Sequence, residues 1–351
     1  MPGTPQEIIG QLETERRTVA YDSYDIIVRQ LVDMVASNEI DIAPDYQRQF
    51  VWKADRESEL IESLLLGIPI PSLYMAVNAK DGTWEVVDGV QRLSTILHFQ
   101  GDAVHLLRIG RDQPLRLEGL SKLSQLNGAS LSDLPAAVRT GFLNRAVRVT
   151  TLNDRSDYDV RFDLFERLNT GGVTLHAQEI RNIVYRGEFK NILRRLSANA
   201  DLRTVLRLSR GTGDAQASAQ YEEAVLRFFA YLERYQTFGH LVTQFLNSYM
   251  HDNADAGPQQ AVLDLFEPTH AFIRAEIPSG IVRGQSTTTP INLYEAVSVG
   301  VALAIRRNGN PRPGVLAALL GNDELRRYTG AGSNSRPMVI GRIELIRNAL
   351  V

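Results

Sequence analysis

The sequence contains no cysteine among its 351 residues. This absence excludes disulfides, cysteine nucleophiles, iron–sulfur clusters and cysteine zinc sites, and it fits a reducing compartment. Apolar runs are short as well, and none approaches the roughly 20 residues that a membrane-spanning helix needs. Residues 1–10 have neither the basic start nor the apolar stretch of a signal peptide. We therefore expect a cytoplasmic protein that has no membrane partner.

Lysine is scarce, and the formal net charge is -3. A protein that binds DNA nonspecifically is usually basic, because phosphate neutralisation supplies most of its affinity. A DNA contact in this chain would therefore depend on a local basic patch. The densest group of arginines consists of Arg194, Arg195, Arg203, Arg207 and Arg210. Such a group is more typical of a solvated helix face than of a DNA-binding surface.

Several catalytic signatures are missing from the sequence. It has no phosphate-binding Gly-Lys-Ser/Thr loop, no Gly-x-Ser-x-Gly, no His-Glu-x-x-His and no HNH nuclease pattern. The six histidines do not follow a metal-ligand spacing. Gly211-Thr-Gly213 lacks the lysine of a phosphate-binding loop, so we interpret it as an ordinary loop.

The hydrophobic pattern predicts an α+β protein with a mixed front and a helical back. The predicted front helices span 7–16, 26–36, 55–66, 91–99, a segment up to residue 168, and one through residue 184. Asp55 and Thr174 are the expected N-caps of two of them. The predicted strands lie at 39–44, 73–77, 83–87 and 145–152, with further strands and loops over 101–151. From residue 189 onward the ordered segments are predicted to be helical.

The strongest local signal is the segment Trp84 to Leu97, in which a strand enters a glycine turn and a helix begins at once. The first N–H groups of a helix and its dipole attract anions. Gly89 permits close approach of a ligand to the backbone, and Arg92 in the first turn offers a charged fork for phosphate. Asp88 at the strand end is a candidate for holding a ribose hydroxyl or Mg²⁺. The alternative is a purely structural corner that carries a surface arginine.

Three ordered blocks carry a family resemblance. Asp88-Gly-Val-Gln-Arg92 resembles the DGQQR motif of the DUF262 family of GmrSD-type restriction systems, with Val90 in place of the first glutamine. The upstream block runs from Pro44-Asp-Tyr-Gln-Arg48 through Trp52 to Ile61–Pro71. The downstream block is Phe165–Leu175 followed by Glu179-Ile-Arg-Asn182.

The resemblance implies a ParB/sulfiredoxin-like domain at residues 25–185, with an extension at 1–24 and an all-helical domain at 186–351. In that superfamily a Gly-x-x-Arg turn meets a nucleotide phosphate, and Gly89 to Arg92 has this spacing. The nucleotide-binding residues implied by the resemblance are Tyr46, Gln47, Arg48, Asp88, Gly89, Gln91, Arg92, Asn169, Thr170 and Gly171. For the loop at 169–172, a plain helix C-cap is an equal alternative.

The family is associated with nucleoside triphosphate binding and hydrolysis coupled to restriction of foreign, often modified, DNA. The implied ligands are GTP, ATP or CTP with Mg²⁺ held by Asp88. Asp88, Gln91 and Arg92 would then be the catalytic residues, because phosphoryl transfer depends on placement and charge neutralisation. We expect a nucleotide-binding regulatory component, an NTPase of low activity, that acts with a separately encoded nuclease or toxin. Direct DNA binding and homo-oligomer formation stay open at this point. The alternatives are an antitoxin-like interaction module and, least favoured, a nuclease.

Overall fold

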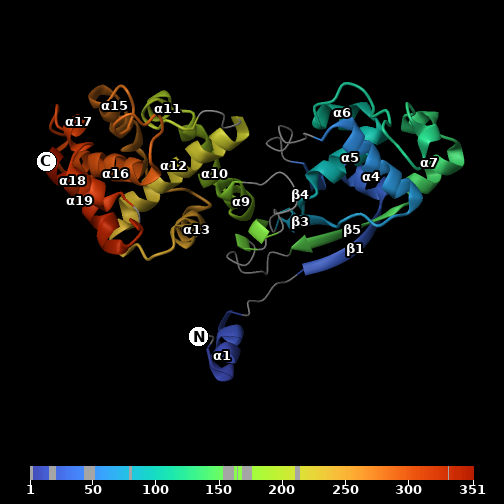
Figure 1. Ribbon diagram of the computed structural model, residues 1–351, viewed down its shortest axis with the longest axis horizontal. Helices are drawn as coiled ribbons and strands as arrows, with labels where there is room; N and C mark the ends of the chain where they lie inside the picture. The colour runs from blue at the N-terminus through green and yellow to red at the C-terminus, as the bar shows by residue number, and fades with distance from the viewer. Residues whose placement is uncertain are drawn as a thin grey trace. The chain divides into compact units, whose positions relative to one another are not determined.

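The computed structural model describes residues 3–15, 21–42, 52–78, 81–152, 162–163, 165–167, 176–209, 214–330 and 332–351. The chain divides into two compact units, Met1–Leu175 and His176–Val351. Within the described residues the first unit mixes helices and strands, whereas the regular elements of the second unit are all helical (Figure 1). The predicted α+β class is thus confirmed, while the ParB/sulfiredoxin-like topology stays a prediction.

The first unit is built on a five-stranded sheet with the order β1-β5-β3-β4-β2. The strands are β1 Tyr21–Ile27, β2 Ile40–Asp41, β3 Leu73–Val77, β4 Trp84–Asp88 and β5 Ala146–Leu152. The β1–β5 and β3–β4 pairs are antiparallel, and the β3–β5 and β2–β4 pairs are parallel. Within β4, strand β2 pairs only with Trp84 and Glu85, whereas β3 pairs as far as Asp88 at the carboxyl end. This end positions the candidate site.

The helices of the first unit are α1 Pro5–Glu15, α2 Val28–Ala36, α4 Ala54–Leu66, α5 Val90–Gln100, α6 Ala103–Arg108 and α7 Ala136–Leu143, with 3₁₀ turns η1 Ser124–Leu126 and η2 Leu131–Asp133. Their buried apolar positions recur at helical spacing, as in Leu93, Ile96 and Leu97 of α5. These side chains join a core that includes Leu73 of β3 and Val86 of β4. The core therefore fixes α5 against the strand that precedes it.

Several sequence predictions in the first unit are wrong. The segment 101–151 contains α6, the 3₁₀ turns and α7, and β5 is its single strand among the described residues. The buried residues Leu115 and Leu117 alternate as in a strand, but the backbone there is irregular, and Leu117 N–H bonds to the Ala129 carbonyl at 2.9 Å. Residues 21–27 form β1, so the helix predicted over 26–36 begins at Val28 instead.

Two predicted helix caps are also wrong. Lys53, not Asp55, is the N-cap of α4, and Asp55 lies inside the first turn, where its charge suits the helix dipole. His176, not Thr174, caps the helix that ends at Val184, and its side chain accepts a hydrogen bond from the Gln178 N–H at 3.2 Å. The predicted end of this helix at residue 66 is confirmed, and Gly67 is its C-cap.

The second unit consists of α9 Ala177–Val184, α10 Glu188–Ser197, α11 Ala200–Val205, α12 Asp214–Arg234, α13 Val242–Asn253, α14 Gln260–Leu263, α15 Phe266–Glu276, α16 Ile291–Asn308, α17 Leu316–Leu319, α18 Asp323–Tyr328 and α19 Arg336–Leu350, with a 3₁₀ turn η4 at Tyr235–Thr237. Helix α16 is buried on every side from Leu293 to Ala304. It packs against α12, α15 and α19 and so forms the centre of this unit. In the described ranges, the helices are too short or too polar to cross a lipid bilayer.

His270 of α15 is fully buried in the second unit. Its Nδ1 donates to the Phe266 carbonyl at 2.7 Å, so Nε2 of the neutral ring accepts from the Tyr294 hydroxyl at 3.0 Å. Burial lowers the pKa of His270 to about 4, although the bond to the Phe266 carbonyl raises it in part. The ring is therefore neutral in the folded protein at pH values where an unfolded histidine, with a pKa of about 6.5, is protonated.

This difference predicts that the second unit loses stability on acidification. Between about pH 6.5 and pH 4 the unfolded chain binds the proton of His270 and the folded chain does not, so the free energy of unfolding falls with pH. The expected loss is on the order of 3 kcal/mol. Urea unfolding followed by far-UV circular dichroism at pH 7 and pH 4.5 measures it. His270→Gln should unfold with a smaller difference between the two pH values, and an unchanged difference would contradict the assignment.

Candidate functional site

The corner between β4 and α5 brings together three of the predicted site residues. Asp88 ends the strand, Gly89 is the N-cap of the helix, and Arg92 lies in its first turn. Gly89 has a φ of 101°, in the left-handed region that favours glycine. A Cβ at Gly89 would lie 2.5 Å from Leu73 Cδ2 and 3.1 Å from Arg92 Nη2. The corner therefore requires glycine both for its backbone conformation and for the close approach of Arg92.

The guanidinium of Arg92 is held against the end of the strand. Its Nη2 donates to Asp88 Oδ2 at 2.6 Å and to the Ser72 carbonyl at 3.0 Å. The side chain is 15% exposed, and Nε is buried without a hydrogen-bond partner among the described residues. Buried donors in folded proteins normally have partners. One donor of Arg92 is thus left for an acceptor that the described residues do not supply.

Asp88 is more accessible than its partner, with 32% of its side chain exposed. Oδ2 accepts from Arg92, whereas Oδ1 accepts no hydrogen bond from the described residues. A single carboxylate oxygen together with phosphate oxygens is a donor set that suits Mg²⁺. Within the described ranges, no three or more acidic or histidine side chains are grouped to hold a metal ion by themselves. Any cation at Asp88 would therefore need further oxygen ligands besides the acidic and histidine side chains of the described residues.

Gln91 connects α5 to the start of α4. Its Oε1 accepts a hydrogen bond from the Trp52 N–H at 3.1 Å. The Trp52 ring in turn lies under the Arg56 guanidinium, with Cζ 4.6 Å from the ring centroid. The resemblance implied a catalytic role for Gln91, and in the structure its side-chain oxygen anchors the chain ahead of α4.

A buried acidic group lies behind this part of the site. Glu57 of α4 is 1% exposed, and its Oε2 lies 2.5 Å from His98 Nδ1 of α5. His98 Nε2 lies 3.0 Å from the Gln113 carbonyl. The ring thus lies between the Glu57 carboxyl group and the Gln113 carbonyl. The pair joins α4 to α5 and keeps the two helices in register.

Six predicted site residues lie outside the described residues: Tyr46, Gln47, Arg48, Asn169, Thr170 and Gly171. The structure therefore does not test whether they meet Asp88, Gly89, Gln91 and Arg92. Sequence reasoning did not identify the backbone partners of the site, the Ser72 carbonyl and the Trp52 N–H. Backbone groups carry no sequence signal, so only the fold could reveal them.

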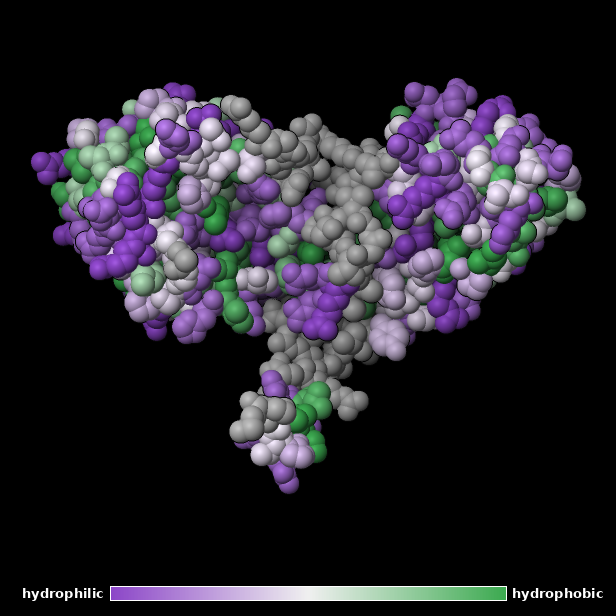
Figure 2. Space-filling model, viewed as in Figure 1, coloured by the Kyte–Doolittle hydropathy of each residue, from purple (hydrophilic) through white to green (hydrophobic). Residues whose placement is uncertain are grey.

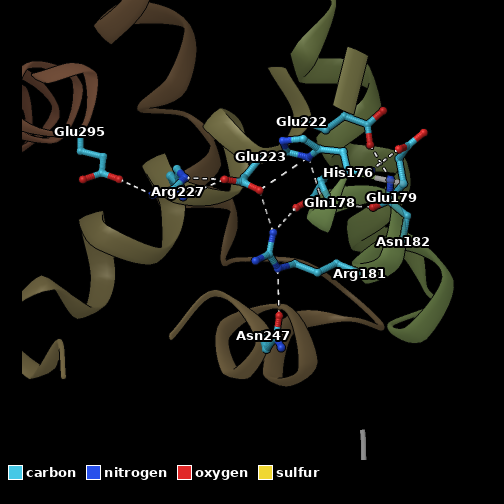
Figure 3. Close-up of polar contacts among 10 residues, drawn as sticks. All are labelled: His176, Gln178, Glu179, Arg181, Asn182, Glu222, Glu223, Arg227, Asn247 and Glu295. Carbon is cyan, nitrogen blue, oxygen red and sulfur yellow. Dashed lines mark hydrogen bonds and ion pairs between the residues drawn. The ribbon is translucent and has the colours of Figure 1, made fainter. Parts of the chain in front are cut away.

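A second polar constellation, which we call the charge ladder, lies in the second unit, and Figure 3 draws all of its members except Arg342. The ladder consists of Arg181, Glu223, Arg227, Glu295 and Arg342, in which the sign of the charge alternates. Arg181 Nη1 contacts Glu223 Oε2 at 3.0 Å, and Glu223 Oε1 accepts from Arg227 Nε at 2.8 Å. Arg227 Nη1 then contacts Glu295 Oε1 at 2.6 Å, and Glu295 also pairs with Arg342. The ladder links α9, α12, α16 and α19.

The ladder is buried almost throughout, with Arg181 2%, Glu295 1% and Arg342 0% exposed. Charges removed from water are costly unless they are paired and hydrogen-bonded. Burial raises the pKa of Glu223, but the charges of Arg227 and Arg181 outweigh it and lower this pKa to about 2. Each carboxylate in the ladder thus depends on the arginines on either side of it.

Arg181 and Glu179, from the third sequence block, both have structural partners within the second unit. Arg181 Nε donates to Asn247 Oδ1 of α13 at 2.9 Å. Glu179 Oε2 accepts from the His176 N–H at 2.6 Å and so completes the capping box of α9. Burial lowers the pKa of His176, while the nearby Glu223 raises it in part. These contacts give both residues a role in anchoring α9.

Comparison with known proteins adds one match. Residues 28–185 match the model of the family described as GmrSD restriction endonuclease, N-terminal domain. No curated protein and no solved structure matches the chain. The matched residues contain the whole β4–α5 corner and continue to Tyr185, one residue beyond the end of α9.

Proposed function

From the match of residues 28–185 to the GmrSD restriction endonuclease N-terminal domain family, we propose that the chain is a nucleotide-binding regulatory component of a DNA-restriction or anti-phage defence system. In this proposal the nucleotide binds at the β4–α5 corner. DNA cleavage belongs to a separately encoded nuclease or toxin partner. The observation that carries the proposal is the Arg92 guanidinium, held at a glycine-capped helix start with one buried donor left over.

The electrostatics of the corner favour a phosphate. The N-cap of α5 is Gly89, and no side chain of the described residues caps the first turn. The positive end of the helix dipole therefore faces the turn. Arg92 adds a positive charge. The Asp88 carboxylate compensates it in part through its hydrogen bond to Nη2. A phosphate oxygen can accept from Arg92 Nε while Nη2 keeps its contacts with Asp88 and Ser72. Because Nε is buried, the phosphate would reach it only after the groups that cover it move aside, while the contacts of Nη2 need not change.

The same residues would also take part in hydrolysis of the nucleotide. Mg²⁺, when bound with the nucleotide, would neutralise phosphate charge, and Asp88 Oδ1 is the oxygen that would hold it. Gln91 would orient a water through Oε1 only after releasing the Trp52 N–H. We therefore assign Gln91 first to positioning α4 and Arg92 to binding phosphate. Tyr46, Gln47, Arg48 and the loop 169–171 remain in the proposed site on the family resemblance.

Replacement of Arg92 by alanine tests nucleotide binding. A lost charged hydrogen bond is worth about 1.5–3 kcal/mol, so the dissociation constant for a non-hydrolysable GTP, ATP or CTP analogue with Mg²⁺ should rise about tenfold or more. Isothermal titration calorimetry measures this constant. Arg92→Lys keeps the charge and loses the Nε donor, and it should fall between Arg92→Ala and the parent protein.

Arg148→Ala is the matched control. Arg148 also pairs with a carboxylate of the first unit, donating to Asp25 at 2.9 and 2.8 Å, but it lies on the exposed β1–β5 pair. Its removal should leave the affinity unchanged. Equal affinity of Arg92→Ala and the parent protein, with the fold intact by circular dichroism, would reject the β4–α5 corner as the site. Phosphate release from each triphosphate then decides between hydrolysis and binding alone.

A further inference from the structure

Helix α1 carries an apolar face that is open to solvent. Ile8 is 44% exposed, Ile9 56% and Leu12 63%. Positions 8 and 12 are one turn apart, with 9 beside them, so the three side chains share one side of the helix. Figure 2 shows hydrophobic residues gathered on one side of this helix (Figure 2). Clustered apolar side chains of this kind mark interaction surfaces.

The sign of the charge on α1 is uniform. The helix contains Glu7, Glu13 and Glu15 and neither lysine nor arginine between Pro5 and Glu15. Glu7 also closes the N-terminal turn, accepting from the Thr4 N–H at 2.7 Å. Helix α1 is therefore a short amphipathic helix of acidic character, and a groove that accepts it should be apolar and basic.

The first unit contains such a groove, with a volume of about 490 Å³, between the end of α4, η1 and α7. Its apolar wall includes Leu66, Leu126, Val138 and Phe142. Leu66 is 42% and Val138 38% exposed, so the wall is accessible. Large apolar side chains at the rim of a concave surface are typical of a helix-binding groove.

The charged residues of the groove complement those of α1. Lys122 and Arg145 line it, and in the described part of the chain its lining includes no acidic residue. Arg145 Nε is buried and has no hydrogen-bond partner among the described residues. We propose that this groove is the docking surface for α1 of a second copy of this chain.

The length of the connection favours a second copy over the same chain. In the β1–β5 pair, Ile27 lies opposite Ala146, next to Arg145, whereas Tyr21 lies at the far end opposite Leu152. Tyr21 is thus about 20 Å from the groove end of the strand at 3.4 Å per residue. The six steps from Glu15 to Tyr21 span at most about 20 Å when fully extended. Within one chain, α1 could reach the groove only with the whole connection fully extended, whereas exchange between two copies removes this requirement and gives a symmetric dimer.

Cross-linking tests the pairing of α1 with the groove. The natural chain has no cysteine, so an introduced pair reacts without background. A size-tagged Leu12→Cys chain is mixed with an untagged Val138→Cys chain and treated with a short thiol-reactive cross-linker. A mixed-size cross-linked dimer is expected. Leu12→Cys mixed with Val104→Cys, which is 58% exposed on α6 outside the groove, is the control and should give little mixed product.

Sedimentation analysis of the full chain provides the second measurement. The parent protein should form dimers, and Leu12→Asp should raise the dimer dissociation constant at least about tenfold through loss of one buried apolar side chain. Leu107→Asp, at a position 80% exposed on α6, is the matched control and should not change it. The proposal would be overturned by a monomeric parent protein or by equal cross-linking to Val104→Cys. It would also be overturned if a chain that carries both Leu12→Cys and Val138→Cys cross-linked only within itself. Binding of a small apolar acid in the groove without dimer formation would also overturn it.

Discussion

Replacing Glu295 with alanine is expected to lower the free energy of unfolding of the second unit by about 3–5 kcal/mol. Glu295 is 1% exposed and pairs with both Arg227 and Arg342. Its removal leaves Arg342, which is fully buried, without a carboxylate partner, and leaves Arg227 with Glu223 alone. Breaking a buried pair is costly because the remaining charge stays out of water and uncompensated.

Two spectroscopic signals can locate this loss in the second unit. Both tryptophans, Trp52 and Trp84, belong to the first unit, so tryptophan fluorescence follows that unit while far-UV circular dichroism follows the helices of both. In urea, Glu295→Ala should shift the dichroism transition of the helical unit. Arg326→Ala removes a pair with Asp323, whose side chain is 95% exposed. This control should cost at most about 1 kcal/mol, and a similar small loss in Glu295→Ala would mean that the ladder is not a major source of stability.

Gly187→Ala is expected to lower the free energy of unfolding by roughly 3 kcal/mol. Gly187 begins α10 with a φ of 152°, in a region that side chains rarely adopt. A Cβ there would lie 2.1 Å from the Ala254 carbonyl oxygen. That oxygen also accepts from the Phe189 N–H at 3.1 Å. Because the obstacle is backbone, the methyl group must separate α10 from the end of α13.

Gly239→Ala provides the comparison for this prediction. A methyl group at Gly239 would meet no atom of the described residues within 4 Å, so the change should alter stability by no more than about 0.5 kcal/mol. Thermal unfolding of the two variants, followed by circular dichroism, measures the difference. Equal unfolding midpoints for Gly187→Ala and Gly239→Ala would show that the junction of α10 and α13 accommodates the added methyl group with little loss of stability.

The strand–turn–helix at the candidate site could be predicted because its signals are local. The alternation of Trp84–Val87, the break at Gly89 and the apolar spacing of α5 each follow from short-range geometry. The strand β1 could not be predicted in this way. Its burial pattern is exposed at five of seven positions, so the strand lacks the apolar alternation of a half-buried strand and depends on pairing with β5.

The partners of the charged residues required the fold. The sequence suggested that Arg92 would reach a phosphate, but not that Ser72 and Asp88 would hold it. Likewise, Arg181 appeared beside a family motif, whereas its carboxylate partner Glu223 is 42 positions away along the chain. Long-range pairs of this kind follow from helix packing, which a single sequence does not specify.

The position of α9 has a practical consequence for any fragment prepared for crystallisation or expression. The family match ends at Tyr185, but Arg181 reaches Glu223 and Asn247, which lie beyond it. A fragment that ends at Tyr185 would lack both partners of Arg181 and would expose the apolar side of α9. We expect such a fragment to aggregate. A cut between Leu175 and His176 keeps every rung of the ladder in one polypeptide.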